Sequence, residues 1–522
     1  MSRLVCAAAV LGLLAFGCSD EDEPEGSGGD GAFAQLQDAL GGQAGLEALE
    51  TLRIVGRGVR NIPNEGNLPD DPAIEANSFT RTVTMDLPSE GLRVDTERTV
   101  EFLFPGTATY SDVLVGNVGV STELLFGAPL GALSSDKAAA IRRQETLLTP
   151  QLLLRGLTAA SFTTQPDVLL EGVNHHRLVL SDGPAPLTLF INAQTGTLSK
   201  LESMELDFFL RDSKLEVFFS DWAEAGDTAF PRKRRLARGG HTLLSEDVTS
   251  IDVNRILVPE AFQFPGDAMP VFNQELFDRG ELSHQWYYLL DSIGLPFNGI
   301  DTAITPRELA PGVVQLVGGS HHSFLVEQAN GIVLVDAPFH EDRGRALSQY
   351  IATRYPGKPL THVVSSHFHE DHSSGIREVL GSNPSAQLVV HESVRDTWRA
   401  ILAAPSTLRP DSLARTPREV SILTVPDAGE LTLADAQHPL TLYPVQTGHA
   451  ADLLFVHEPS SNSVFVVDIY SPGLAYPDAP AFAAALTERN IPTANLKVAG
   501  GHGAEIHDYA QVQAQLPGAQ QL

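Results

Sequence analysis

The sequence contains few cysteines and few basic residues for its length. Its 522 residues include two cysteines, Cys6 and Cys18, and 35 lysines and arginines against 65 aspartates and glutamates, which gives a net charge of −30. We do not expect so acidic a chain to bind nucleic acid, because that requires a basic face against the phosphates. The same charge disfavours docking of the protein surface onto anionic lipid head groups.

Long apolar runs are also missing, apart from one near the N-terminus. Arg3 gives a short positive region, residues 4–16 are apolar but too short to span a bilayer, and Gly17 and Cys18 follow. This end resembles a bacterial lipoprotein signal, in which the cysteine becomes the acylated first residue of the mature chain. We therefore expect residues 1–18 to be a signal peptide with Cys18 as the lipidation site. An ordinary secretory signal cleaved near Gly17 is the alternative.

The residues after Cys18 agree with a membrane anchor. Residues 19–31 are acidic, rich in glycine and free of large apolar side chains, which predicts a flexible tether. Ser19, rather than aspartate, follows Cys18, and by the sorting rules of Gram-negative bacteria this indicates the outer membrane, facing the periplasm. With Cys6 removed in the leader and Cys18 carrying lipid, the mature chain has no free thiol and no disulfide.

The length and the hydrophobic content of 43% predict two domains after the leader. Residues 32–300 are expected to form a mainly antiparallel β domain with an N-terminal helix, since helical spacing in 33–52 is followed by strand-like alternation and turns. The rhythm resembles periplasmic lipoprotein-carrier half-barrels. That resemblance implies an apolar groove for acyl chains, whereas a sheet that only packs on the catalytic domain is the alternative. The expected strands are 79–87, 92–100, 177–180, 187–191 and 215–219.

The most informative motif is His-Phe-His-Glu-Asp-His at residues 367–372, directly after the apolar run 361–364 and two serines. Imidazole and carboxylate groups on a loop at a strand's end suit divalent metals of the zinc type. In an extended backbone, residues two apart face the same way, so His367 and His369 can meet one metal. Asp371 and His372 follow where the chain turns and can reach a second metal.

Further candidate ligands follow short apolar segments that read as buried strands. His449 comes after residues 440–445, Asp468 after 463–467, and His502 after 496–499. Loops at strand ends commonly carry function. The set contains no cysteine, which structural zinc sites favour.

These residues together resemble the metallo-β-lactamase superfamily, whose pattern is a His-x-His-x-Asp-His loop followed by a lone His, an Asp and a final His. The resemblance covers residues 308–522 and implies an αββα sandwich of the α/β class. It assigns His367, His369 and His449 to a first metal, and Asp371, His372 and His502 to a second. Asp468 would bridge the two metals, and Asp371 would also orient the nucleophile.

The resemblance implies a binuclear zinc-dependent hydrolase. Two cations lower the pKa of a shared water, toward about 7 in the best zinc cases, and a bridging hydroxide would attack an ester, lactone, thioester or similar bond of a small molecule. One alternative is a persulfide dioxygenase that binds a single iron through His367, His369 and Asp468. The other is a lipid-binding lipoprotein without catalysis. The sequence indicates neither an oligomeric state nor a protein partner.

Three further assignments complete the predicted site. Asp336, which ends the apolar run 331–335, is expected to brace the ligand loop from outside, since outer partners orient metal ligands. Tyr470 is a candidate donor to a developing oxyanion, with packing under the loop as the alternative. His321 and His322 are adjacent, so on a strand they point to opposite faces and cannot readily chelate one ion. For this pair, support of the ligands or contact with substrate is the alternative to packing.

Overall fold

The computed structural model describes residues 28–516, except 103–104, 126–127, 182–184, 281–287, 295–297, 300–301 and 475. The predicted signal peptide, Cys18 and most of the predicted tether lie outside the described residues. Helix α1 (Gly28–Ala39) begins within the last four residues of that tether, and its side chains Phe33 and Leu36 are buried in the main apolar core. Among the described residues, no helix has both the length and the apolar character needed to span a bilayer.

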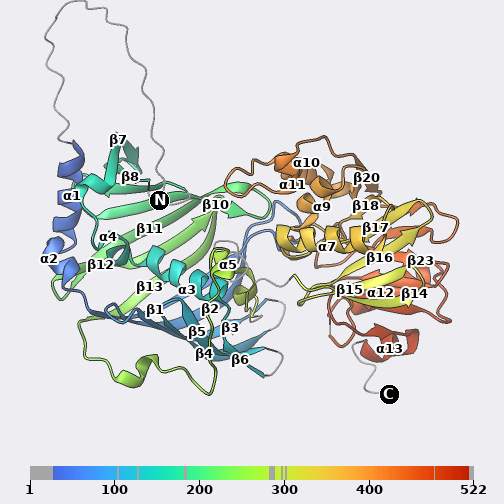
Figure 1. Cartoon of the computed structure of the whole chain (residues 1–522), viewed down its shortest axis with the longest axis horizontal. Coiled ribbons are helices and arrows are strands. Elements are labelled where there is room, and N and C mark those ends of the chain that lie inside the picture. Colours follow the sequence, from blue (N-terminus) through green and yellow to red (C-terminus); the bar gives the residue numbers. More distant parts are fainter. Residues whose placement is uncertain are drawn as a thin grey trace, which may run out of the picture.

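The N-terminal region is built on one large antiparallel sheet (Figure 1). Within the described residues it has thirteen strands in the order β6-β5-β4-β3-β2-β1-β13-β12-β11-β10-β9-β8-β7. Strand β1 therefore lies in the middle, where Ile54 is paired with Val83 of β2 and with Ile251 of β13. The predicted antiparallel β domain is confirmed. Its strands are β1 (Thr51–Ile62), β2 (Ile74–Asp86), β3 (Gly91–Val100), β4 (Gly106–Val115), β5 (Val118–Leu125), β6 (Ala128–Ala132), β7 (Phe162–Leu170), β8 (Val173–Leu180), β9 (Leu187–Asn192), β10 (Leu198–Asp207), β11 (Arg211–Ala225), β12 (Thr228–Arg238) and β13 (His241–Val253).

The predicted N-terminal helix is divided in two. Helix α1 is followed by α2 (Gly42–Glu47), and the chain enters β1 at Thr51. Gly41 makes the break, with a φ of 102° and a backbone so close to the Asp227 carbonyl that a Cβ would lie 1.9 Å from the oxygen. Only glycine fits such a position without strain.

Helix α3 (Ser135–Leu148) covers part of the large sheet and is followed by α4 (Pro150–Leu154) (Figure 1). Buried charged side chains connect α3 to the sheet: Arg81 of β2 contacts Glu145 of α3 and Glu246 of β13. This covered part of the sheet is therefore not purely apolar. The likeness to lipoprotein-carrier half-barrels and the acyl-binding groove stay predictions.

The C-terminal region contains two further sheets, counted within the described residues. The seven-stranded sheet has strands β14 (Thr305–Ala310), β15 (Val313–Val317), β16 (Ser323–Gln328), β17 (Gly331–Val335), β18 (Leu360–Val364), β19 (Gln387–His391) and β20 (Ile422–Val425), in that order. The six-stranded sheet has β21 (Leu431–Leu433), β22 (Leu440–Pro444), β23 (Leu454–Glu458), β24 (Ser463–Val466), β25 (Lys497–Gly500) and β26 (Ile506–His507). Valine, leucine and phenylalanine side chains from both sheets, such as Phe324 and Phe465, form one apolar core.

Helices accompany both of these sheets. Helices α7 (Glu341–Arg354) and α9 (Ile376–Ser382) pack on each other, and α9 contacts β18. On the six-stranded sheet, Phe482 of α12 (Ala479–Glu488) meets Phe455 of β23 edge to face. The other helices that the structure describes are α5 (Gln274–Phe277), α8 (Glu370–Ser373), α10 (Arg395–Ala403), α11 (Ser412–Arg415) and α13 (Tyr509–Gln515), with short 3-10 turns at Ala159–Ser161, Pro259–Phe262 and Glu392–Val394.

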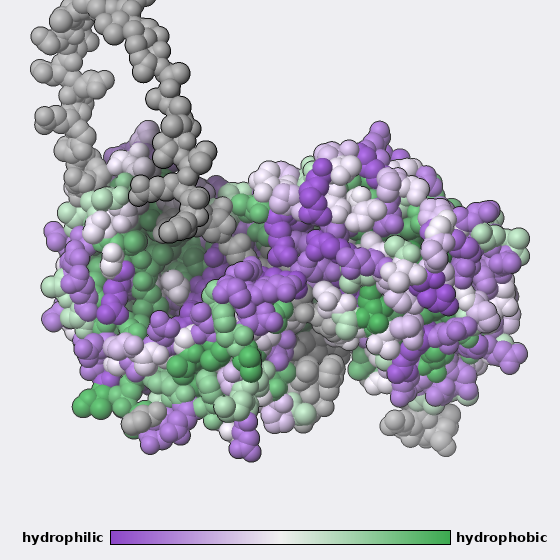
Figure 2. Space-filling model, in the orientation of Figure 1, coloured by the Kyte–Doolittle hydropathy of each residue, from purple (hydrophilic) through white to green (hydrophobic). Residues whose placement is uncertain are grey.

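The two regions lie side by side and are joined by specific polar contacts (Figure 1). Asp212, at the start of β11, accepts hydrogen bonds from the backbone N–H groups of Thr407 and Leu408, and Arg211 donates to Ser406. The visible surface also differs between the regions, since apolar residues gather over the N-terminal region and the C-terminal region is mostly polar (Figure 2). The contacts fix how the large sheet approaches the strand ends described next.

Candidate metal centre

The predicted ligands come from loops that follow four strands, β18 of the seven-stranded sheet and β22, β24 and β25 of the six-stranded sheet. Strands β17 and β18 of one sheet run parallel, as do β24 and β25 of the other, so their carboxyl ends meet at one edge of the molecule. The structure brings all seven predicted ligands together there: His367, His369, Asp371, His372, His449, Asp468 and His502. All of them are buried or nearly so.

Asp468 is the centre of this cluster. Its Oδ2 lies 3.2 Å from the Nε2 atoms of His367 and His449 and 2.9 Å from Nε2 of His372, while its Oδ1 lies 2.9 Å from Nε2 of His502. The backbone at Asp468 has a φ of 55°, in the left-handed region, so the turn after β24 aims this carboxylate at the histidines. One carboxylate thus contacts both predicted metal groups.

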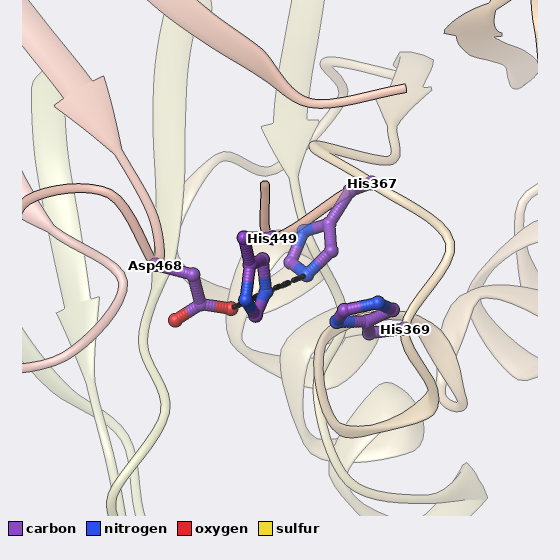
Figure 3. Close-up of side chains that lie close together, drawn as sticks. All are labelled: His367, His369, His449 and Asp468. Carbon is purple, nitrogen blue, oxygen red and sulfur yellow. Dashed lines mark hydrogen bonds and ion pairs between the residues drawn. The ribbon is translucent and has the colours of Figure 1, made fainter. Parts of the chain in front are cut away.

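The first group is drawn in Figure 3, where three imidazoles and Asp468 converge. The Nε2 atoms of His367 and His449 are 3.4 Å apart. Two nitrogens bound to one tetrahedral zinc at about 2.0–2.1 Å would be separated by about 3.3–3.4 Å. The spacing of these two nitrogens therefore fits a shared cation.

The outer nitrogens of the histidines have their own partners, which fix the direction of each ring. Nδ1 of His367 lies 3.0 Å from the Ser366 hydroxyl, and Nδ1 of His502 donates to the Ser320 carbonyl at 2.7 Å. In both residues Nε2 is left to face the cluster. Hydrogen bonds within the protein thus orient these two Nε2 atoms toward the cluster.

Asp336 supports the ligand loop as predicted. Its carboxylate accepts hydrogen bonds from the backbone N–H and the hydroxyl of Ser366, at 2.7 and 2.8 Å, and lies 3.7 Å from Nδ1 of His372. It touches the loop between β18 and His367 rather than the centre of the cluster. Its φ of 60° places it in a turn that only a few non-glycine residues adopt.

His321 takes part in the site, and its contact to Asp371 was not predicted. Its Nε2 donates to Oδ2 of Asp371 at 2.9 Å, and its ring lies against those of His372 and His502. Burial lowers the pKa of His321 to about 3, so the ring is neutral at pH 7. Burial alone would raise the pKa of Asp371, but His372 and the hydrogen bond from His321 hold it well below its ordinary value. Asp371 is therefore an oriented carboxylate.

The structure corrects the assignment of Tyr470. This residue is fully buried, its hydroxyl is 2.6 Å from Nδ1 of His507, and its ring stacks on Phe482. It packs beneath the loop after β24, which was the alternative prediction for this residue. The phenol at the site belongs instead to Tyr476, which hydrogen-bonds to Asp468 and whose pKa is raised well above its ordinary value by burial.

One further carboxylate in the cluster was not predicted and comes from the N-terminal region. Glu65 lies in the loop between β1 and β2, and its Oε2 is 3.5 Å from Nδ1 of His369. Its neighbour Gly66 accepts a hydrogen bond from Nε2 of His369 at 2.8 Å. No sequence signal points to this loop, because the contact joins residues 303 positions apart.

A cavity of about 450 Å³ opens beside the cluster. Asp371, His449, Asp468 and His502 lie on its polar side. The rest of its lining is mostly small and apolar and includes Val317, Pro472, Leu474, Ala504 and, from the N-terminal region, Ile293. This size and polarity suit a small organic substrate with a few polar groups.

The residues present fit divalent cations. Among the described residues, several buried atoms that could bind a metal have no hydrogen-bond partner. They are Nδ1 of His369, Oδ1 of Asp371 and Oε1 of Glu65. Buried polar groups are normally paired, so such a cluster of unpaired acceptors requires an external partner. Imidazole nitrogen and carboxylate oxygen are zinc ligands, and other divalent first-row transition metals bind the same types of ligand.

A two-sheet domain with a histidine and aspartate cluster at its strand ends defines a candidate metal-binding protein. A model of the metallo-beta-lactamase superfamily matches residues 316–482. The match lies within the C-terminal region and includes six of the seven predicted ligands. No curated protein matches the chain.

Several solved structures are similar to the chain. A flavodiiron protein from Giardia intestinalis has 14% identity and a TM-score of 0.31, covering 40% of this chain and 57% of its own. A metallo-beta-lactamase from Pontibacter korlensis has 19% identity and a TM-score of 0.32, covering 42% of this chain and 100% of its own. The DIM-1 metallo-beta-lactamase has 20% identity and a TM-score of 0.32, covering 42% and 99%. The chain thus spans less than two thirds of the flavodiiron protein.

Proposed function

We propose that the protein is a binuclear zinc-dependent hydrolase of a small ester, lactone, thioester or similar substrate. The observation that carries this proposal is the position of Asp468, whose Oδ2 contacts His367, His449 and His372 and whose Oδ1 contacts His502. A carboxylate shared in this way suits two cations held side by side. The two packed sheets and their helices support the αββα sandwich as the fold behind the site.

The protein's own residues would divide the chemistry as follows. When bound, two zinc ions would lower the pKa of a water and polarise the substrate's carbonyl oxygen. Oδ1 of Asp371 can accept a hydrogen bond from the attacking water, because Oδ2 is already fixed by His321. Tyr476 stands at the cavity wall, where its hydroxyl, which already donates to Asp468, can accept a hydrogen bond from a polar group of the substrate.

The cavity supports the choice of substrate class. Its apolar lining by Val317, Leu474 and Ala504 leaves room for an acyl group of moderate size next to the polar cluster. The net charge of −30 disfavours a nucleic-acid substrate. A neutral small molecule with a cleavable acyl bond fits both observations.

Metal content tests the proposal directly. We expect the purified protein to hold about two zinc ions per chain by elemental analysis and to hydrolyse members of a panel of lactones, esters and thioesters. The His369→Ala variant should lose metal and activity. The matched control is His362→Ala, on β18 but outside the cluster, which should keep both. Roughly one iron per chain with little zinc would favour the persulfide dioxygenase, and hydrolysis by His369→Ala at the normal rate would exclude the binuclear mechanism.

We further propose that the protein is exported and anchored by lipid on Cys18, which lies outside the described residues. The amino-acid pattern around Cys18 supports this. Cys18→Ser should move the protein from the membrane fraction to the soluble fraction. A wild-type protein that is already soluble would contradict the anchor.

A further inference from the structure

We propose that Glu65 of the N-terminal region is an additional ligand of the metal centre, on the side of His369, so that the large β-sheet region completes the active site. This inference rests on the proposed function, since it assigns one more residue to the same site. None of the predicted ligands lies in the N-terminal region. The assignment stands on distance, on the anchoring of the loop and on the burial of an unpaired carboxylate.

The distances place Glu65 within the ligand shell. Its Oε2 is 3.5 Å from Nδ1 of His369, and the ligand atoms of Glu65, His369 and Asp371 all lie within 4.8 Å of one another. Two donor atoms bound to one zinc at about 2.0–2.2 Å lie about 3.0–3.6 Å apart, depending on the coordination angle. The gap between Glu65 and His369 falls in that range.

The loop that carries Glu65 is fastened on both sides of the site. The Gly66 carbonyl accepts the hydrogen bond from Nε2 of His369, which forces Nδ1 of the same ring to face Glu65. The Asn67 side chain donates to the carbonyls of Thr447 and Gly448, at 3.2 and 3.3 Å, directly before His449. Gly66 and Asn67 therefore hold the two histidine loops of the first metal group and position the Glu65 carboxylate beside His369.

Hydrogen bonds from the backbone strengthen this fastening. The Asn67 carbonyl accepts from the N–H of Ala451 at 2.9 Å. On the other side of the loop, Asn64 has a φ of 61°, a left-handed conformation that asparagine tolerates better than most residues. The loop is held in one shape rather than lying loosely over the cavity.

Among the residues that the structure describes, no lysine or arginine forms an ion pair with Glu65, whose ion-pair contact is to His369. Glu65 is 4% exposed, and no hydrogen-bond donor reaches its Oε1 among the described residues. The ionisable groups that act on it most are the carboxylates of Asp371, Glu370 and Asp468, with His372 opposing them. A buried carboxylate among other carboxylates is strongly unfavourable unless a positive charge is near. A divalent cation in the ligand cluster supplies that charge.

Zinc affinity of the full chain, measured by competition with a chromophoric chelator, tests the assignment. We expect Glu65→Gln to weaken the binding of one of the two zinc ions by about 10- to 100-fold. The matched control is Glu75→Gln, an exposed glutamate at the start of β2, whose zinc affinity should stay within about twofold of wild type. The visible spectrum of the cobalt-substituted protein should change in Glu65→Gln and not in Glu75→Gln.

If Glu65 had only a structural role, Glu65→Gln would lower the unfolding temperature of the metal-free protein and leave the zinc affinity unchanged. If Glu65 is a metal ligand, metal-free Glu65→Gln should unfold at the same temperature as wild type or higher, because the substitution removes a buried carboxylate whose Oε1 has no hydrogen-bond partner among the described residues. If Glu65→Gln does not fold, Glu65→Asp withdraws the carboxylate by one methylene and should weaken zinc binding in the same direction. Unchanged zinc affinity and an unchanged cobalt spectrum, in variants of a wild type that binds two zinc ions, would overturn the inference. A wild type that binds no zinc would instead overturn the proposed function.

Discussion

The protein buries two clusters of charged side chains, and they are balanced in different ways. In the N-terminal region, Arg81 donates to both oxygens of Glu246, at 2.8 and 2.9 Å, and to Glu145 at 2.5 Å, and Arg234 donates to Glu246 at 2.7 Å. In the C-terminal region, the ion pairs that the described residues make with Asp371 and Asp468 are to histidines alone. The first cluster carries its own cations, whereas the second requires them from solution.

The difference shows what a buried carboxylate needs in each place. Burial would raise the pKa of Glu246, but Arg234 and Arg81 together lower it to about 2. A bidentate arginine gives this carboxylate both charge and hydrogen bonds. The imidazoles of the metal centre cannot supply positive charge as arginine does, because a ring that offers a lone pair to a metal has to be neutral. The arginine cluster should therefore affect stability, and the histidine cluster should affect metal binding and activity.

Asp468→Ala gives the largest expected effect, because this carboxylate contacts both predicted metal groups. We expect activity to fall at least about 1,000-fold, equivalent to about 4 kcal/mol of transition-state stabilisation, together with the loss of bound zinc. Elemental analysis and hydrolysis assays measure both. Asp427→Ala, an exposed aspartate in the same region, is the control and should behave as wild type. Normal metal content in Asp468→Ala would show that this carboxylate is not needed to hold the metals, and the histidine cluster would then not differ from the arginine cluster in the way described.

Arg81→Ala should separate stability from metal binding. Removing one partner of a buried ion pair typically destabilises a protein by about 3–5 kcal/mol, and here it leaves Glu145 without Arg81. Urea unfolding should show that loss, while the folded variant still binds two zinc ions. Arg399→Ala, which breaks an exposed pair with Asp396, should change stability by less than about 1 kcal/mol. Loss of zinc from folded Arg81→Ala would show that the clusters are not independent.

The metal ligands could be predicted from the sequence, because each follows a short apolar strand and most lie in one contiguous motif. His367, His369, Asp371 and His372 are local, and parallel strands bring the remaining ligands to the same edge. Glu65 could not be predicted in this way. Its place depends on how a loop of the large sheet docks on strands some 300 residues later, and no periodicity in the sequence encodes that docking.

The large sheet shows a second limit of sequence patterns. Alternation predicted several of its strands, including those that became β2, β3 and β8. It could not predict that β1 pairs with β13, since strand order depends on contacts across nearly 200 residues. Nor could it place Arg81 and Glu246 inside, because a charged residue in an alternating strand normally indicates the solvent face. Their burial depends on α3, which supplies Glu145 and covers them.

Glu246→Gln adds a pH test of the balanced cluster. The pKa of Glu246 falls from an ordinary 4.5 to about 2, which corresponds to about 3 kcal/mol of stability. Because the folded pKa is lowered, this stability is present above pH 4.5 and is lost as the pH falls toward 2. Metal-free wild type should therefore exceed Glu246→Gln in unfolding free energy by about 3 kcal/mol at pH 7, and the difference should shrink steadily below pH 4.5. A difference that does not depend on pH would show that the arginines do not stabilise the charged form.

Asp336→Asn has the smallest expected effect and sharpens the comparison from inside the metal centre. Asp336 is a buried carboxylate of that region that does have donors, since the backbone N–H and hydroxyl of Ser366 both bond to it. It should therefore behave as a positioning residue, whose change weakens zinc affinity by about 10- to 100-fold while two ions still bind at high zinc. The amide keeps one acceptor but presents a donor to Ser366 or His372. The ligand loop therefore loses a hydrogen bond that positions it, while its metal ligands stay in place. Saturating zinc should recover most of the activity of Asp336→Asn and none of that of Asp468→Ala. Equal recovery in both variants would mean that bracing and ligation are not distinct roles here.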